Sequence, residues 1–139
     1  MRPCTALGCL LALLVLGGCS NAHRTDEKSA QGAVDALLGT CAADRPQASL
    51  EVLDAPARDA FARAPSALEG CLEVLGLRPA GNQAAVRHAF GRTRVVGVSA
   101  NAMAGAVVIE APDGSRSRLE VENVRGDWRV AHPARPSAL

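Results

Sequence analysis

This chain of 139 residues contains five cysteines and three histidines, whose side chains could carry chemistry. Cys4, Cys9 and Cys19 lie close to the amino terminus, whereas Cys41 and Cys71 lie well inside the chain. A cysteine sulfur can carry a lipid, form a disulfide or bind a metal ion. The segment that surrounds each cysteine decides which of these roles it fits.

An apolar segment from Thr5 to Gly18 directly precedes Cys19. As a helix, its 14 residues would extend about 21 Å, which is shorter than the roughly 30 Å hydrocarbon core of a bilayer. The charge of Arg2 before the segment and the small residues at its end are typical of a secretory signal peptide. We therefore expect the segment to be cleaved rather than to span a membrane.

Residues 16–19, LGGC, resemble the lipobox of a bacterial lipoprotein signal, which reads Leu, a small residue, Gly or Ala, and Cys. The resemblance implies removal of residues 1–18, lipidation of the Cys19 sulfur and anchoring at the extracytoplasmic face of the plasma or outer membrane. Each buried CH₂ contributes about 0.8 kcal/mol, so two or three acyl chains hold a protein durably. The alternative is an ordinary secretory signal with an incidental Cys19, although it lacks an A-x-A site.

Composition divides the rest of the chain into a tether, one domain and a tail. Residues 20–28 are polar without apolar periodicity, so we interpret 19–28 as a lipidated tether. Residues 29–132 suffice for a single domain, and we expect a flexible tail over 133–139. With only two Phe and one Trp in the chain, the core must consist mainly of Ala, Val and Leu, and a cross-link would stabilise it.

Cys41 and Cys71 remain as a pair in an oxidising compartment, and we predict that they form a disulfide. In the chain-entropy model, closing a loop of about 31 residues contributes roughly 3.7 kcal/mol. Two separate buried thiols are the alternative. We expect neither a metal site nor a cofactor, because no histidine lies near the pair and no dinucleotide, phosphate-loop or zinc motif is present.

Both cysteines lie on apolar helical stripes. Apolar residues recur at i, i+3 and i+4 from Ala30 to Cys41 and from Leu68 to Leu75, which predicts two amphipathic helices with the cysteines on their buried faces. Short helices are also expected near 46–53 and 56–63. The residues expected to cap helices are Asp44, Asp54 and Ser66.

The remainder of the domain shows strand patterns. Residues 83–92, QAAVRHAFGR, fit either a short helix or the start of a strand, and turns are expected at Pro112-Asp113-Gly114 and Gly126-Asp127. We expect Trp128 on the core face. Four runs rich in β-branched residues predict an antiparallel meander with one exposed face: RTRVVGVSA, GAVVIEA, SRLEVENV and DWRVAH. The expected fold class is α+β, with short N-terminal helices packed on one face of a four-stranded antiparallel sheet.

Charge is distributed unevenly, with acidic residues in excess over 19–77 and basic residues in excess over 78–139. The two halves could simply form opposite solvated surfaces. Alternatively, the basic half could face anionic phospholipid or wall polymer. Glu120 and Glu122 lie on one face of a predicted strand. They could act as a pair of carboxylates in catalysis or simply belong to a solvated sheet surface. The arginines that could form a basic patch are Arg116, Arg118, Arg125 and Arg129, but without interleaved aromatic residues we do not expect nucleic acid as a partner.

The domain resembles small actinobacterial lipoproteins with a cystatin-like or nuclear transport factor 2-like cone. Three segments carry the resemblance: LLGTCAAD, ALEGCLEVL and the closing VRGDWRVA. The resemblance covers roughly residues 29–132 and implies a curved sheet around helices, with a pocket at the wide mouth. SnoaL-like members of that superfamily use a histidine with an acid for proton transfer. The residues that could take these parts here are His88 and His132, with Asp35 and Asp59 as acids.

No spacing links these histidines to either acid, and no nucleophile motif is present. The sequence therefore favours a lipid-anchored, non-catalytic envelope protein that binds a small ligand or an envelope protein on its sheet or in the mouth of the cone. The alternative is a SnoaL-like acid-base enzyme, and a secreted inhibitor of cystatin-like shape is a third possibility. Fold analogy alone does not supply an activity.

Overall fold

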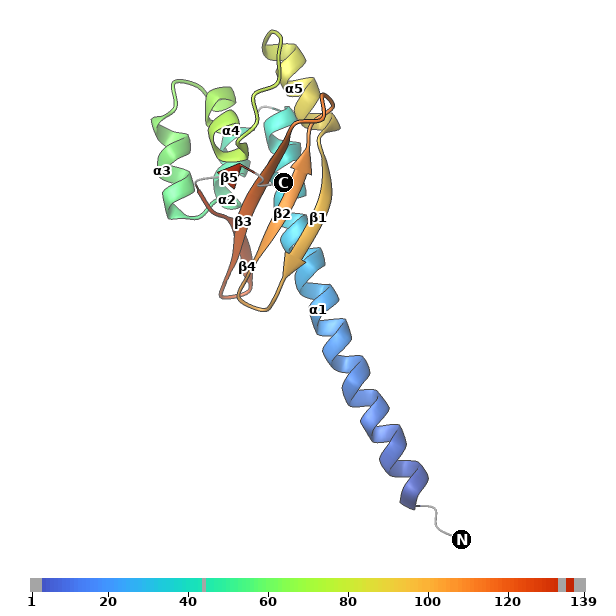
Figure 1. The fold of residues 1–139 in the computed structure, drawn as a ribbon. Coiled ribbons are helices and arrows are strands. Elements are labelled where there is room, and N and C mark those ends of the chain that lie inside the picture. Colours follow the sequence, from blue (N-terminus) through green and yellow to red (C-terminus); the bar gives the residue numbers. More distant parts are fainter. Residues whose placement is uncertain (1–3, 44, 133–134, 137–139) are drawn as a thin grey trace.

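The structure, a computed structural model, describes residues 4–43, 45–132 and 135–136, with side chains for 24–43, 45 and 47–132. Figure 1 shows a long helix that projects from a small α+β domain. The fold class expected from the sequence is confirmed at that level: within the described residues, five helices accompany an antiparallel sheet of four main strands, which a fifth strand of two residues joins. The helices are α1 Cys4–Ala43, α2 Pro46–Glu51, α3 Ala55–Arg63, α4 Ala67–Leu75 and α5 Gln83–Arg92.

The two amphipathic stripes are confirmed as the helical part of the core. The predicted stripe of α1 is buried from Ala30 to Cys41, and α4 buries Leu68, Cys71 and Leu75. Further along the chain, the ambiguous segment 83–92 is a helix rather than a strand. Tertiary packing decides this, because α5 buries its large apolar side chains against the same core: Val86 and Phe90.

Side-chain caps define where the short helices begin. The carboxylate of Asp54 accepts a hydrogen bond from Ala57 N at 2.8 Å, and Ser66 Oγ accepts one from Glu69 N at 3.2 Å, as predicted. Asp44, the cap expected for α2, lies outside the described residues. The N-cap position of α2 is Arg45, whose side chain makes no capping hydrogen bond.

Helix α1 is longer than the sequence suggested. It continues without interruption through 19–28, the segment interpreted as a tether. No Gly or Pro occurs between Cys19 and Gln31. The helix that contains the buried stripe therefore meets no helix-breaking residue in this segment. Side chains 24–28 are exposed or half-buried, and Ala30 is the first buried residue among the side chains that the structure describes.

The sheet is the predicted meander, in the order β1-β2-β3-β4, with antiparallel neighbours throughout. Its strands are β1 Arg94–Ala100, β2 Ala104–Glu110, β3 Arg116–Val124 and β4 Asp127–Val130. Residues 135–136, expected in the flexible tail, instead form β5 and pair with the start of β3. They fit there because β4 pairs only with residues 121–124 of β3. The rest of the expected tail, at 133–134 and 137–139, lies outside the described residues.

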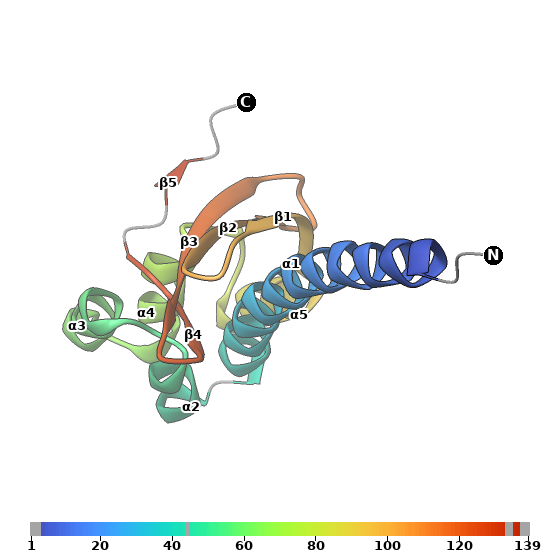
Figure 2. The ribbon, with the colours of Figure 1, turned by 90° about the horizontal axis from the view of Figure 1, so that it is seen from below.

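One face of the sheet is buried and the other is exposed, as the alternation predicts. Leu119 and Val121 are 0% and 2% exposed, whereas Arg118 on the same strand faces solvent. Val130 is fully buried and Trp128 is half-buried against the core. Figure 2 shows that the sheet curves and that α1 lies on its concave side. The space inside the curve is therefore occupied by α1.

The turn between β3 and β4 differs from the expected Gly126-Asp127. Val124 and Asp127 are paired strand residues, so the loop consists of Arg125 and Gly126. Both adopt positive φ, at 56° and 91°, which is the backbone that a two-residue hairpin loop requires.

Cys41 and Cys71 form the predicted disulfide, which joins α1 to α4 with a Cα–Cα distance of 5.9 Å. Both residues are buried, at 1% and 4% exposure. The alternative of two separate buried thiols is therefore wrong.

Candidate functional site

A pocket of about 290 Å³ between α3, α4 and the chain after β4 contains a histidine and two carboxylates. Helix α4 supplies Glu69 and Glu73, which are one turn apart on the face opposite its buried stripe. Three small residues, Ala60, Ala64 and Pro65, line the α3 side of the pocket together with Arg63. His132 completes the pocket.

Backbone hydrogen bonds on both sides of Val130 fix the position of His132. Val130 N donates to Val52 O at 2.7 Å, and Val130 O accepts from Asp54 N at 2.9 Å. Segment 52–54 thus lies parallel to β4 at its free edge. The chain that leaves β4 is directed toward α4, where His132 meets Glu73.

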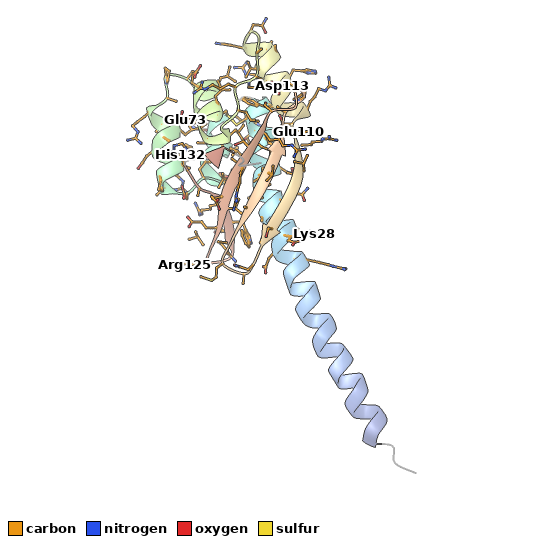
Figure 3. The ribbon with its side chains drawn as sticks, in the orientation of Figure 1. Lys28, Glu73, Glu110, Asp113, Arg125 and His132 are labelled. Carbon is orange, nitrogen blue, oxygen red and sulfur yellow. A yellow bond between two sulfur atoms is a disulfide. The ribbon has the colours of Figure 1, made fainter. Side chains whose placement is uncertain are left out.

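His132 Nε2 lies 3.6 Å from Glu73 Oε1, and Figure 3 shows the two residues side by side. The side chain of His132 is 18% exposed, and its Nδ1 is buried without a hydrogen-bond partner among the described residues. Arg78 lies 3.9 Å from Glu73 and 4.0 Å from Glu69. The pocket therefore offers an imidazole, two carboxylates and cationic groups at its rim, which suit a polar ligand or a proton transfer.

The structure separates the other residues considered for acid-base chemistry. His88 is exposed on α5, in a shallow depression of about 520 Å³ that contains Arg87 and Arg92 but no acid among its lining residues. Asp35 and Asp59 are exposed on α1 and α3, and neither lines the pocket of His132. The sequence does not indicate Glu73 as the acid. Its position on the polar face of α4 is the one signal that could have singled it out.

The exposed face of the sheet carries charges that compensate one another. Glu110 Oε2 accepts a hydrogen bond from Arg116 Nε at 2.8 Å, and Glu110 Oε1 accepts one from Arg94 at 3.2 Å. These hydrogen bonds, with that from Arg116 the larger cause, lower the pKa of Glu110 from its ordinary value of 4.5. Arg118 lies 3.4 Å from Glu120, so Glu120 belongs to a solvated ion pair.

The arginine patch considered from the sequence is thus largely neutralised where it meets the sheet. Arg116 and Arg118 have carboxylate partners, and Arg129 lies 3.9 Å from Asp127. Beside Arg118 and Glu120, small side chains leave a shallow trough of about 380 Å³ on this face. The trough and the pocket of His132 both present mixed charge.

Cys19 lies within α1, but its side chain belongs to the residues whose side chains the structure does not describe. In the described ranges, no helix combines the length and the apolar character needed to cross a membrane. Among the same residues, no group of three or more His, Cys, Asp or Glu is arranged to hold a metal ion.

Comparison of the chain with models of known protein families, with curated proteins and with solved structures finds no match in any of the three.

Proposed function

We propose that this chain is a lipid-anchored protein of the bacterial cell envelope whose extracytoplasmic domain binds a polar ligand or an envelope partner without catalysis. The observation that carries the proposal is the Cys41–Cys71 disulfide. Disulfides persist in oxidising compartments outside the cytoplasm, and a buried cross-link stabilises a core poor in aromatic residues. The predicted signal and the disulfide thus agree on the compartment.

The position of the core supports processing at Cys19. Among the side chains that the structure describes, the buried part of α1 begins at Ala30, so removal of residues 1–18 would leave this part intact. Residues 24–28 contribute no buried side chain, so cleavage and acylation would occur outside the folded domain. The lipid on Cys19 would then be the membrane anchor.

The curved sheet around α1 supports the finer proposal of a cystatin-like or nuclear transport factor 2-like cone (Figure 2). In this chain, however, α1 and large apolar side chains such as Phe90 and Ile109 occupy the concave side. The pocket of His132 lies outside that curve, between α3 and α4. We therefore assign ligand binding to this pocket rather than to the mouth of the cone.

The charges of the pocket favour a ligand that carries both hydrogen-bond donors and acceptors. Glu69 and Glu73 can accept, Arg63 can donate, and the imidazole of His132 can do either. The side chain of Glu73 is 46% exposed and has Arg78 as a second neighbour, so water reaches the carboxylate. Such a site is better suited to holding a polar group than to the water-excluded chemistry of an enzyme.

Two measurements test the anchor. Intact-mass analysis of the protein from a bacterial host should show a chain that begins at an acylated Cys19, and Cys19→Ala should release it from the membrane fraction. An unprocessed, unacylated start would overturn the assignment.

A separate measurement tests the ligand site. Fractionated envelope extracts are added to the acylated protein in detergent micelles while the NMR signals of the histidine rings are followed. Ligand binding should shift the His132 signals and leave those of exposed His88 unchanged. Replacing His132 with Asn should weaken binding by about tenfold, which corresponds to one lost hydrogen bond. Equal shifts at His88 and His132, or at neither of them, would contradict the assignment.

A second function, SnoaL-like acid-base catalysis, is favoured by one observation, the 3.6 Å separation between His132 Nε2 and Glu73 Oε1. An enzyme would release a chemically altered molecule from the extract, and Glu73→Gln would abolish that conversion. A binding protein would release the same molecule that it bound. Mass spectrometry of the bound fraction before and after incubation separates these functions.

A further inference from the structure

The end of the domain at which α1 leaves carries an exposed apolar surface. Two of the three large hydrophobic side chains that are exposed among the described residues lie there, Met103 at 73% and Val124 at 40%. The third, Val96 at 38%, lies on β1 nearer the opposite end of the sheet. Met103 lies in the β1–β2 loop, and Val124 adjoins the β3–β4 turn, which also exposes Arg125. We call Met103, Val124 and Arg125 the tip surface.

Asn123 connects the two loops through hydrogen bonds. Asn123 N donates to Met103 O at 2.8 Å, and Asn123 Nδ2 donates to Ala102 O at 2.9 Å. Its Oδ1 accepts a hydrogen bond from Gly126 N at 2.8 Å, within the turn that follows β3. Asn101 Oδ1 in turn accepts from Met103 N at 2.9 Å. These bonds hold Met103 in the loop conformation that leaves its side chain in solvent.

The tip surface and the exit of α1 lie at the same end of the domain. Figure 3 shows Arg125 and Lys28 on opposite sides of this end, and Figure 1 shows α1 continuing from there toward the amino terminus. Cys19 precedes Lys28 by nine residues of helix, which is about 14 Å of rise. A lipid on Cys19 would therefore bring this end of the domain, and not its opposite end, close to a bilayer.

We propose that the tip surface contacts the phospholipid headgroup region of the membrane that holds the protein. This inference rests on the proposed lipid anchor at Cys19. Met103 and Val124 would enter the boundary between headgroups and acyl chains, and Arg125 would meet phosphate groups. The neighbouring charges of α1 are mixed, because Arg24 and Lys28 accompany Asp26 and Glu27, so apolar contact is the main attraction.

The contact would set the orientation of the domain. With the tip surface on the membrane, the β2–β3 turn is at the far end of the sheet, where Figure 3 shows Asp113. The exposed face of the sheet then stands upright from the bilayer, and the anchor and the tip surface together restrict rotation of the domain.

The experiment compares two labelled positions at opposite ends of the sheet. Met103→Cys and, as the matched control, Pro112→Cys are introduced separately into the full chain and produced in a bacterial host. The acylated protein is labelled with an environment-sensitive fluorophore and reconstituted into vesicles of phosphatidylethanolamine and phosphatidylglycerol that contain a lipid-attached quencher. We expect a blue shift and quenching at position 103 and neither at position 112. Adding Val124→Asp to the Met103→Cys chain should reduce the quenching, because insertion would then bury a charge.

Three outcomes would overturn the inference, and they are distinguishable. An acylated protein that stays with the vesicles but shows equal, unquenched signals at both positions refutes the tip contact and leaves the anchor standing. A blue shift at position 103 without vesicles means that a second copy of the chain covers the tip surface. A chain without acyl groups that remains in the aqueous fraction refutes both the proposed function and the inference drawn from it.

Discussion

Cys41 on α1 is bonded to Cys71 on α4, so that a single covalent link joins the longest helix to the helix that carries Glu73. The bond closes the part of the chain that contains α2 and α3, and it lies in the buried core. The wall of the candidate pocket is therefore held to the rest of the domain by a cross-link as well as by apolar contacts.

Replacing both cysteines with alanine should lower the free energy of unfolding by about 2–5 kcal/mol, because the unfolded chain regains the entropy that the closed loop removes. Urea unfolding followed by circular dichroism measures the change. Reduction of the unaltered protein with dithiothreitol is the matched control, since it breaks the bond and keeps both side chains. Midpoints that stay the same in the double variant and on reduction would show that the bond contributes no stability.

Gly70 and Gly39 differ in the space available for a Cβ atom, and this difference predicts opposite changes in stability. A Cβ at Gly70 on α4 would lie 2.7 Å from Cδ2 of Phe61, whereas a Cβ at Gly39 on α1 would meet nothing within 4 Å. Gly70→Ala should therefore destabilise the domain by about 1–3 kcal/mol through overpacking. The exposed change Gly39→Ala should stabilise it by up to about 1 kcal/mol through helix propensity. Denaturation midpoints that move in the same direction for both variants would contradict the packing shown here.

The ion pairs of Glu110 give a prediction about pH. Its pKa in the folded protein is lowered, first by the hydrogen bond from Arg116 and then by that from Arg94. A lowered pKa means that the folded state favours the carboxylate, so this stabilisation is present above the ordinary pKa of 4.5 and is lost as the pH falls through the lower, folded value.

NMR titration of the Glu110 carboxyl carbon measures this effect directly. Arg116→Gln should raise the pKa of Glu110 toward its ordinary value, and Arg94→Gln should raise it by less. Glu110→Gln should weaken the fall of stability with acid in the same pH range. An equal response to both arginine variants would show that the two hydrogen bonds do not differ in the way the structure indicates.

The elements of this fold were largely predictable because their signals are local. The alternation of Leu119 and Val121 with charged neighbours defines β3, and the stripe that ends at Cys41 defines the buried face of α1. The segment at 83–92 was ambiguous because its choice of helix depends on Phe90 reaching the distant core. Pairing of 135–136 with β3 was also not predictable, since it depends on the short length of β4.

The candidate site was less predictable than the fold. The sequence indicates His132 as a candidate and Asp35 or Asp59 as its acid, whereas the structure places Glu73 beside it. The two residues are distant in sequence, and no motif links them. The parallel pairing of Leu53 with Val130 helps to position the end of β4, and the sequence contains no local signal for that contact.

Arg125 is the one residue other than glycine with positive φ in the described part of the chain, at 56°. It precedes Gly126 in the two-residue loop between β3 and β4, a position at which Asn is favoured and a longer side chain strains the backbone. Arg125→Asn should therefore raise the free energy of unfolding by up to about 1 kcal/mol. Arg125→Lys, which keeps the charge and the strain, should leave it unchanged, and Arg125→Val should lower it because a β-branched residue tolerates this backbone least. Urea unfolding of the three variants distinguishes backbone strain from charge, since a gain in both the Asn and the Lys variant would assign the effect to the side chain of arginine instead.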